Sequence, residues 1–206
     1  MHKVGVDMCE SLSGIENVAP WRSPLARALH RNRSQPHSRY FQLATVQADG
    51  RPANRTVVFR GFLDDTNLLK IITDTRSQKF DQIVYKPWAE ACWYFTVTRE
   101  QFRIAGELSL IDANHPDLEL QKARQSTWQD LSDNARLQFA WPHPGKPRDH
   151  QEAFSPSVLD PASPIANFCL LLLAPTQVDH LELRGEPQNR WSYLRGHTWS
   201  TSAINP

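Results

Sequence analysis

Apolar and polar residues alternate along several stretches of this 206-residue chain. Alternation combined with β-branched and aromatic residues predicts β-strands. The pattern predicts three strands within residues 40–75, with turns at "ADGRP" and "LDDTN", and a hairpin over 90–112 that turns at "TRE". Two further strands are predicted at 167–183, broken by Pro175, and at 189–206. Six or seven strands in hairpin order indicate an antiparallel barrel or sandwich.

Helical spacing of apolar residues separates these strands. It predicts a short amphipathic helix over 23–34, a second over 77–86, and a polar helical region over 115–140. Residues 141–164 carry too many prolines for regular structure. Residues 1–18 are small and polar, which predicts a flexible N-terminal extension. The chain is therefore expected to form one domain, residues 19–206, with flanking helices.

Composition narrows the possible partners. Lys and Arg number 23 against 22 Asp and Glu, so the charge gives no support for nucleic-acid or membrane binding. The basic run 27–39 leaves RNA contact open, but a solvated helix face fits a net charge of +1 better. No apolar run approaches the roughly 20 residues of a membrane span. Three isolated cysteines predict free thiols in a cytoplasmic protein, and the histidines lack metal-site spacing, so no metal site is predicted.

The stretch "NRTVVFRGF", residues 54–62, places two arginines in one predicted strand. Because side chains alternate across a strand, Arg55 lies on one face and Arg60 on the other, each beside apolar residues. A strand that only packs a core, with one solvated face, would keep both charges outside. The pattern predicts anion ligands, or else two arginines that pair with surface carboxylates.

Four segments in order then resemble the FMN-binding split-barrel proteins of the pyridoxamine 5′-phosphate oxidase type, in an oxidase-related branch. They are "YFQLATVQADGRPANRTVVFR", "IITDTRSQKFDQI", "EQFRIAG" and the tail from "QVDHLEL". The resemblance spans roughly residues 20–206. It implies a mainly β fold, an antiparallel split β-barrel. It also implies a homodimer with FMN at the subunit interface.

The resemblance assigns roles on the strand described above. Arg55 is implied as the ligand of the FMN phosphate, which a planar guanidinium grips bidentately. Backbone groups of Thr56, Val57 and Val58 are implied to face the isoalloxazine edge. Arg60 falls near the substrate's phosphate in the oxidases, so it is expected at the substrate side of the cofactor.

The resemblance also assigns cofactor contacts to the strand end and helix start at 72–79. These are Ile72, Thr73, Ser77, Gln78 and Lys79. Free N–H groups at a helix start favour an anion. Gln78 departs from the family, which usually has an arginine there. An ordinary capped helix is the alternative.

Later positions complete the implied site. Gln101 is expected at the polar edge of the flavin ring, unless it is a solvent-facing glutamine, and Arg190 as a second flavin contact. Arg124 is a possible substrate ligand, although its spacing does not align cleanly with the family. The tail departs most, because "EPQ" at 186–188 stands where the oxidases carry an arginine and a histidine.

These matches predict an intact flavin pocket without the known substrate pocket. The expected function is that of an FMN-dependent oxidoreductase of unknown small-molecule substrate and unknown catalytic residues. Two alternatives remain. One is a true pyridoxamine/pyridoxine 5′-phosphate oxidase, and the other is a non-catalytic flavin- or haem-binding protein.

Overall fold

The computed structural model of the chain describes residues 18–206. The predicted flexible extension, residues 1–18, lies outside the described residues except for Val18. Within the described part of the chain, no helix has both the length and the hydropathy to cross a bilayer.

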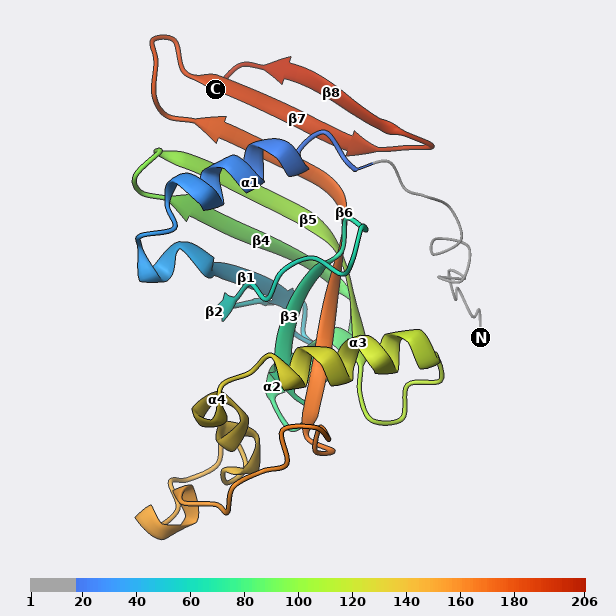
Figure 1. Cartoon of the computed structure of the whole chain (residues 1–206). Helices are drawn as coiled ribbons and strands as arrows, with labels where there is room; N and C mark the ends of the chain where they lie inside the picture. The colour runs from blue at the N-terminus through green and yellow to red at the C-terminus, as the bar shows by residue number, and fades with distance from the viewer. Residues whose placement is uncertain (1–17) are drawn as a thin grey trace.

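In the described part of the chain, eight antiparallel strands form one strongly curved sheet (Figure 1). Their bounds are β1 Tyr40–Val46, β2 Pro52–Val58, β3 Leu69–Asp74, β4 Trp88–Phe95, β5 Glu100–Ile111, β6 Phe168–Glu182, β7 Asn189–Arg195 and β8 Trp199–Ile204. The three strands expected within 40–75 and the hairpin over 90–112 are present. The last segment differs from the prediction, because it folds back at residues 196–198 and forms two strands instead of one.

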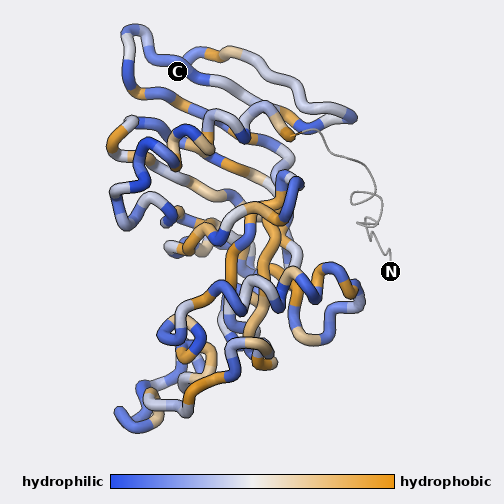
Figure 2. The backbone as a smooth tube through the Cα atoms, in the orientation of Figure 1, coloured by the Kyte–Doolittle hydropathy of each residue, from blue (hydrophilic) through white to orange (hydrophobic). Residues whose placement is uncertain are grey.

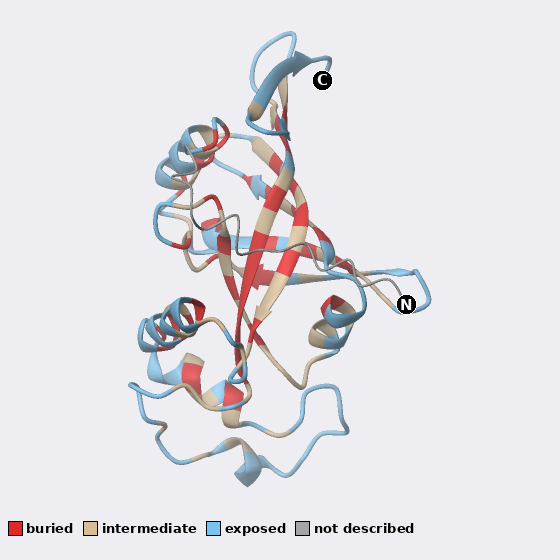
Figure 3. Cartoon of the chain, turned by 90° about the vertical axis from the view of Figure 1, so that its right-hand side faces the viewer, coloured by how far each residue is buried: buried red, intermediate tan, exposed pale blue. Residues whose placement is uncertain are grey.

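Within the described residues, four α-helices flank the sheet, and they overlap the three regions for which helical spacing was predicted; the region 115–140 contains two of them. The four helices are α1 Arg22–Arg31, α2 Gln78–Tyr85, α3 Leu118–Gln129 and α4 Asp133–Leu137. Single 3-10 turns cover Pro36–Arg39, Gln138–Ala140 and Gln151–Phe154. The rest of the proline-rich stretch is irregular, and Figure 3 shows it as a largely exposed loop at the bottom of the view.

The long strand β6 splits the barrel into two parts. One of its edges pairs with β5 along nearly its whole length. The other edge pairs first with β3, over residues 168–173, and then with β7, over residues 177–182. The sheet therefore opens between β3 and β7, which is the split that the family resemblance implied.

Pro175 does not break this strand, contrary to the prediction. The strand continues through it because the pairing with β5 shifts register between Ala105 and Gly106, as in a β-bulge. Gly106 lies opposite Pro175, and a Cβ atom there would come within 2.0 Å of the Ala174 carbonyl oxygen. A glycine is therefore required at this close approach.

The main hydrophobic core fills the inner side of the sheet beneath α1. Trp21, Leu25 and Ala28 from the first helical segment belong to the same buried cluster as Phe41 and Trp93 of the sheet. A separate cluster, formed by Trp128, Leu131, Phe139 and Phe168, joins the later helices to the start of β6. Figure 2 shows the apolar residues concentrated on the central strands, where the buried residues also lie in Figure 3.

Candidate cofactor-binding cleft

A cleft of about 690 Å³ lies between β2, the end of β3, the start of α2 and the segment that follows α4. The structure brings to it every cofactor residue predicted between 55 and 79 except Gln78. Those lining it are Arg55, Thr56, Val57, Val58, Arg60, Ile72, Thr73, Ser77 and Lys79. Gln78 is exposed at the first position of α2. The assigned residues therefore share one cavity, although their contact with a cofactor stays a prediction.

Arg55 is a half-buried cation that lines the cleft. Its guanidinium donates to the Thr45 hydroxyl at 2.6 Å, to the Gln82 side-chain oxygen at 2.8 Å and to the Leu43 carbonyl at 3.1 Å. These acceptors are all neutral. Among the ion pairs of residues 18–206, none includes Arg55. Burial lowers the pKa of Arg55, so its charge is poorly solvated and would be stabilised by an anion.

Lys79 places a second cation in the same part of the cleft. Its ammonium donates to the Thr73 hydroxyl at 2.5 Å, and that hydroxyl lies 3.1 Å from the Ser77 hydroxyl. Burial, followed by repulsion from Arg55, lowers the pKa of Lys79 to about 8. Ser77 precedes α2 and makes no side-chain capping bond to it. The helix start and two cations therefore favour a multiply charged anion such as a phosphate.

Arg60 lies at the other end of β2 and also lines the cleft. Its Nε atom is buried and has no hydrogen-bond partner among the described residues. Burial lowers its pKa, with a smaller contribution from Arg39. A buried donor without a partner is costly, so this position also suits an anionic or hydrogen-bonding ligand.

Gln101 and Arg190 do not line the cleft of their own chain. They lie in one row across the sheet, because Gln101 pairs with Leu181, which pairs in turn with Arg190. Arg190 forms a bidentate ion pair with Asp179, with donor–acceptor distances of 3.1 and 2.7 Å. A second copy of the chain would be needed to bring these residues to a cleft.

The sheet face that carries this row also reaches the cleft. Cross-strand partners point to the same side of a sheet, and the pairing runs from Thr56 through Gln42, Cys92 and Arg103 to Asp179. Cleft and row therefore lie at opposite ends of one sheet face.

The structure does not bring Arg124, the residue predicted as a possible substrate ligand, into the cleft. Its side chain is buried away from the cleft and donates to the carbonyls of Phe168 at 3.0 Å and Ile165 at 2.8 Å. The guanidinium joins α3 to the start of β6.

Sequence reasoning missed the wall of the cleft opposite β2 and α2. Residues 138–154, called here the cleft wall, line much of the cavity. This segment includes Trp141, Lys146 and Arg148, from the stretch whose prolines predicted only irregular structure. No periodicity marked these residues, and their basic character in a proline-rich segment was the only available signal.

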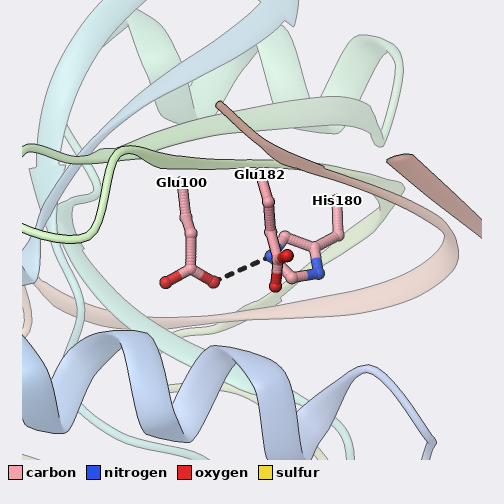
Figure 4. Close-up of side chains that lie close together, drawn as sticks. All are labelled: Glu100, His180 and Glu182. Carbon is pink, nitrogen blue, oxygen red and sulfur yellow. Dashed lines mark hydrogen bonds and ion pairs between the residues drawn. The ribbon is translucent and has the colours of Figure 1, made fainter. Parts of the chain in front are cut away.

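Glu100, His180 and Glu182 form a separate cluster outside the cleft (Figure 4). Their ligand atoms lie within 4.8 Å of one another, so among the described residues they could hold a metal ion, which the sequence did not predict. However, His180 Nε2 contacts Glu100 at 2.9 Å and its Nδ1 has no partner. Metal-bound histidines almost always donate through the second nitrogen, so we interpret the cluster as a buried pair that joins β5 to β6.

Comparison with known proteins shows which family this chain resembles. The family model described as "Pyridoxamine 5'-phosphate oxidase, FMN-binding domain" matches residues 18–112. An Arabidopsis thaliana protein named pyridoxine/pyridoxamine 5′-phosphate oxidase 2 is 40% identical over 195 residues, which cover 92% of this chain and 98% of that protein.

Two solved structures have a similar fold. A pyridoxamine 5′-phosphate oxidase-related, FMN-binding protein from Nostoc punctiforme superposes with a TM-score of 0.90 at 65% identity, covering 92% of this chain and all of that one. PhzG from Burkholderia lata, solved with tetrahydrophenazine-1-carboxylic acid, has a TM-score of 0.74 at 19% identity, covering 92% and 94%, and shares the fold.

The fold is that of the split-barrel FMN-binding proteins. Within that class, the chain belongs to the pyridoxamine 5′-phosphate oxidase family. Both the resemblance and the fold predicted from the sequence are confirmed.

Proposed function

We propose that this protein binds FMN in the cleft and is an FMN-dependent oxidoreductase. The observation that carries the proposal is a pair of cations, Arg55 and Lys79, that form no ion pair within residues 18–206 and lie beside the uncapped start of α2. Together they suit the terminal phosphate of FMN. When bound, the flavin supplies hydride or electron transfer, and the protein supplies position and electrostatics.

The edge strand β2 would support the flavin ring. Within the sheet, β2 is the first strand and pairs only with β1. Backbone groups on the outer edge of such a strand are free to bond a planar heterocycle. Thr56 is exposed and Val58 half-buried on the sheet face beside the cleft, which supports the predicted contact of residues 56–58 with the ring edge.

The substrate is proposed to be a small molecule that carries an anionic group. Arg60 lines the cleft with a donor that has no partner, and Lys146 and Arg148 line it from the cleft wall. Among the ion pairs of the described residues, none includes these three side chains. Their combined charge would attract a carboxylate or phosphate.

A second candidate is pyridoxine or pyridoxamine 5′-phosphate oxidation itself. Its support is the full-length similarity to the Arabidopsis protein that carries this name. The cations of the cleft would attract the phosphate of either compound. A turnover assay decides between the two candidates.

We propose that two copies of the chain form the complete site. The sheet face between the cleft and the Gln101–Arg190 row exposes three large aromatic side chains. They are Tyr40 at 47%, Trp88 at 45% and Tyr94 at 42% exposed. A two-fold axis on this face would bring the partner's row toward the cleft. In an isologous interface, each end of the contact surface of one chain meets the opposite end of the same surface on the other chain.

We predict that FMN binding requires this dimer. Dilution below the dimer dissociation constant should release the cofactor, because each cleft would lose the groups that the partner supplies. Sedimentation velocity with detection at both the protein and flavin wavelengths measures this. A monomer that sediments with one FMN per chain would contradict the two-chain site.

The lowered pKa of Lys79 gives a pH prediction. FMN binding should weaken as the pH rises above about 8, because Lys79 then loses the charge that attracts the phosphate. The dissociation constant should rise by up to about tenfold per pH unit, since each binding event must then take up a proton. Without FMN the folded state instead gains stability as the pH rises from about 8 toward 10.5, because only the unfolded chain keeps the proton.

Fluorescence titrations of FMN at a series of pH values test this, with Lys79→Gln as the control. The variant should bind more weakly at neutral pH and show no slope above about pH 8. A variant that keeps the wild-type slope would assign the titration to another group.

The experiment for the function as a whole starts with colour. Purified protein should be yellow with FMN, whereas a haem protein would be red-brown and an empty pocket colourless. Anaerobic mixing with NADH and NADPH then reveals whether the flavin accepts electrons from either donor. If the bound flavin is neither reduced by any donor or substrate nor reoxidised by any oxidant, a non-catalytic role is favoured.

We propose a cytoplasmic location for this activity. Cys92 and Cys169 are free thiols in the fold, which fits a reducing compartment. The third cysteine, Cys9, lies outside the described residues.

A further inference from the structure

Arg76 lines the cleft, but its guanidinium already makes four hydrogen bonds to protein groups. Its Nε and one terminal nitrogen bind the two carboxylate oxygens of Asp74 at 2.9 and 2.7 Å. The side chains are 23% and 16% exposed, so this bidentate pair is largely shielded from solvent. Its hydrogen bond to Asp74 raises the pKa of Arg76. Its charge is therefore neutralised within the protein, unlike that of Arg55.

The same guanidinium holds the start of the cleft wall. It donates to the Phe139 carbonyl at 3.1 Å and to the Trp141 carbonyl at 3.0 Å. Asn167 adds one bond, from its side-chain nitrogen to the Phe139 carbonyl at 3.2 Å. Arg76 thus joins the loop between β3 and α2 to a segment more than sixty residues away in the sequence.

Beyond Trp141 the cleft wall is bonded mainly to itself. Trp141 packs edge-on against Phe154, with ring centroids 5.8 Å apart, and Arg148 lies 4.8 Å above the Phe154 ring. The next hydrogen bonds to the body of the protein come at Asp160 and Ala162, from side chains of α3. The position of Lys146 and Arg148 over the cleft therefore depends on the anchors at the two ends of this stretch.

We propose that Arg76 is a positioning residue that fixes the cleft wall against the end of β3, and so holds Lys146 and Arg148 where a substrate's anionic group would enter. It does not bind the FMN phosphate. That Arg76 holds the cleft wall is argued from hydrogen bonds within the chain. That this helps to bind a substrate rests on the proposed function.

Hydrogen–deuterium exchange of Arg76→Ala tests the proposal. Peptides within 139–154 should exchange faster by on the order of tenfold or more, because charge-assisted bonds to two carbonyls are lost, while peptides of β3, β6 and the barrel keep their rates. FMN affinity should stay within about threefold of the wild type, since the phosphate cations remain.

The control is Arg51→Ala. Arg51 pairs with Asp49 in the same Asp-x-Arg spacing, but its side chain is 75% exposed and binds Asp49 without joining two distant segments. Its loss should change neither measurement. If Arg76→Ala does not fold, Arg76→Lys serves instead, because a single ammonium cannot grip the carboxylate and reach both carbonyls.

Two results would overturn the proposal. One is exchange that is unchanged in 139–154 or raised equally throughout the barrel, and the other is a loss of FMN affinity as large as that of Arg55→Ala. If the wild type binds no FMN at all, the proposed function fails, whereas the exchange pattern of the FMN-free protein still decides the role of Arg76.

Discussion

Arg55→Ala should bind FMN at least tenfold more weakly than the wild type. The substitution removes a half-buried guanidinium that has no carboxylate partner among the described residues and that lines the cleft beside Lys79. Hydrogen bonds to charged groups contribute about 1.5–3 kcal/mol each, and about 1.4 kcal/mol corresponds to a tenfold change in affinity. Titration of the FMN-free protein, followed by flavin fluorescence, measures the change.

The same substitution also removes bonds to Thr45 and Gln82 inside the barrel. Thermal unfolding therefore accompanies the titration, and Arg55→Lys provides a variant that keeps the charge but not the planar fork. Arg51→Ala is the matched control, because it removes an exposed arginine outside the cleft. If a folded Arg55→Ala protein binds FMN as tightly as the wild type, the assignment of the phosphate site fails.

Pyridoxine and pyridoxamine 5′-phosphates should be turned over poorly or not at all. The chain has "EPQ" at 186–188, an exposed stretch before β7, and so lacks the arginine and histidine that the family motif implied for substrate orientation. Arg60 and the cations of the cleft wall would still attract the phosphate. Binding without orientation forfeits much of the rate that positioning supplies, up to about 7–11 kcal/mol of the barrier in the best cases.

The assay incubates FMN-loaded protein with each compound in air and follows the formation of pyridoxal 5′-phosphate. Omission of the enzyme and Arg55→Ala are the two controls. Turnover at rates ordinary for an enzyme, on the order of 1 per second or more, would mean that other residues orient the substrate. The second candidate function would then be correct.

Local patterns were sufficient to predict most of the fold. Alternation and turn residues located the strands from β1 to β5, and the helical spacing located α1 and α2. The passage of β6 through Pro175 was not predictable, because it depends on Gly106 in another strand. The final hairpin was read as one strand, since its turn at 196–198 carries a weak signal in the sequence.

The candidate site was predicted where its residues are contiguous, and missed where it depends on distant contacts. Residues 55–60 and 72–79 lie in two short segments whose order and spacing carried the family resemblance. The position of Arg124 outside the cleft was not predictable, because its acceptors, the carbonyls of Ile165 and Phe168, lie more than forty residues away in the sequence. Arg76 resembles Arg51 locally, and only the structure shows its contacts with the cleft wall.

A crystal structure of the protein grown with FMN tests the central claim most directly. The account predicts the FMN phosphate within hydrogen-bond distance of Arg55 and Lys79, the flavin ring along residues 56–58 of β2, and Gln101 and Arg190 of a second copy beside the ring. A fully occupied FMN with its phosphate away from Arg55 and Lys79, or crystals that hold no FMN at saturating concentration, would contradict it.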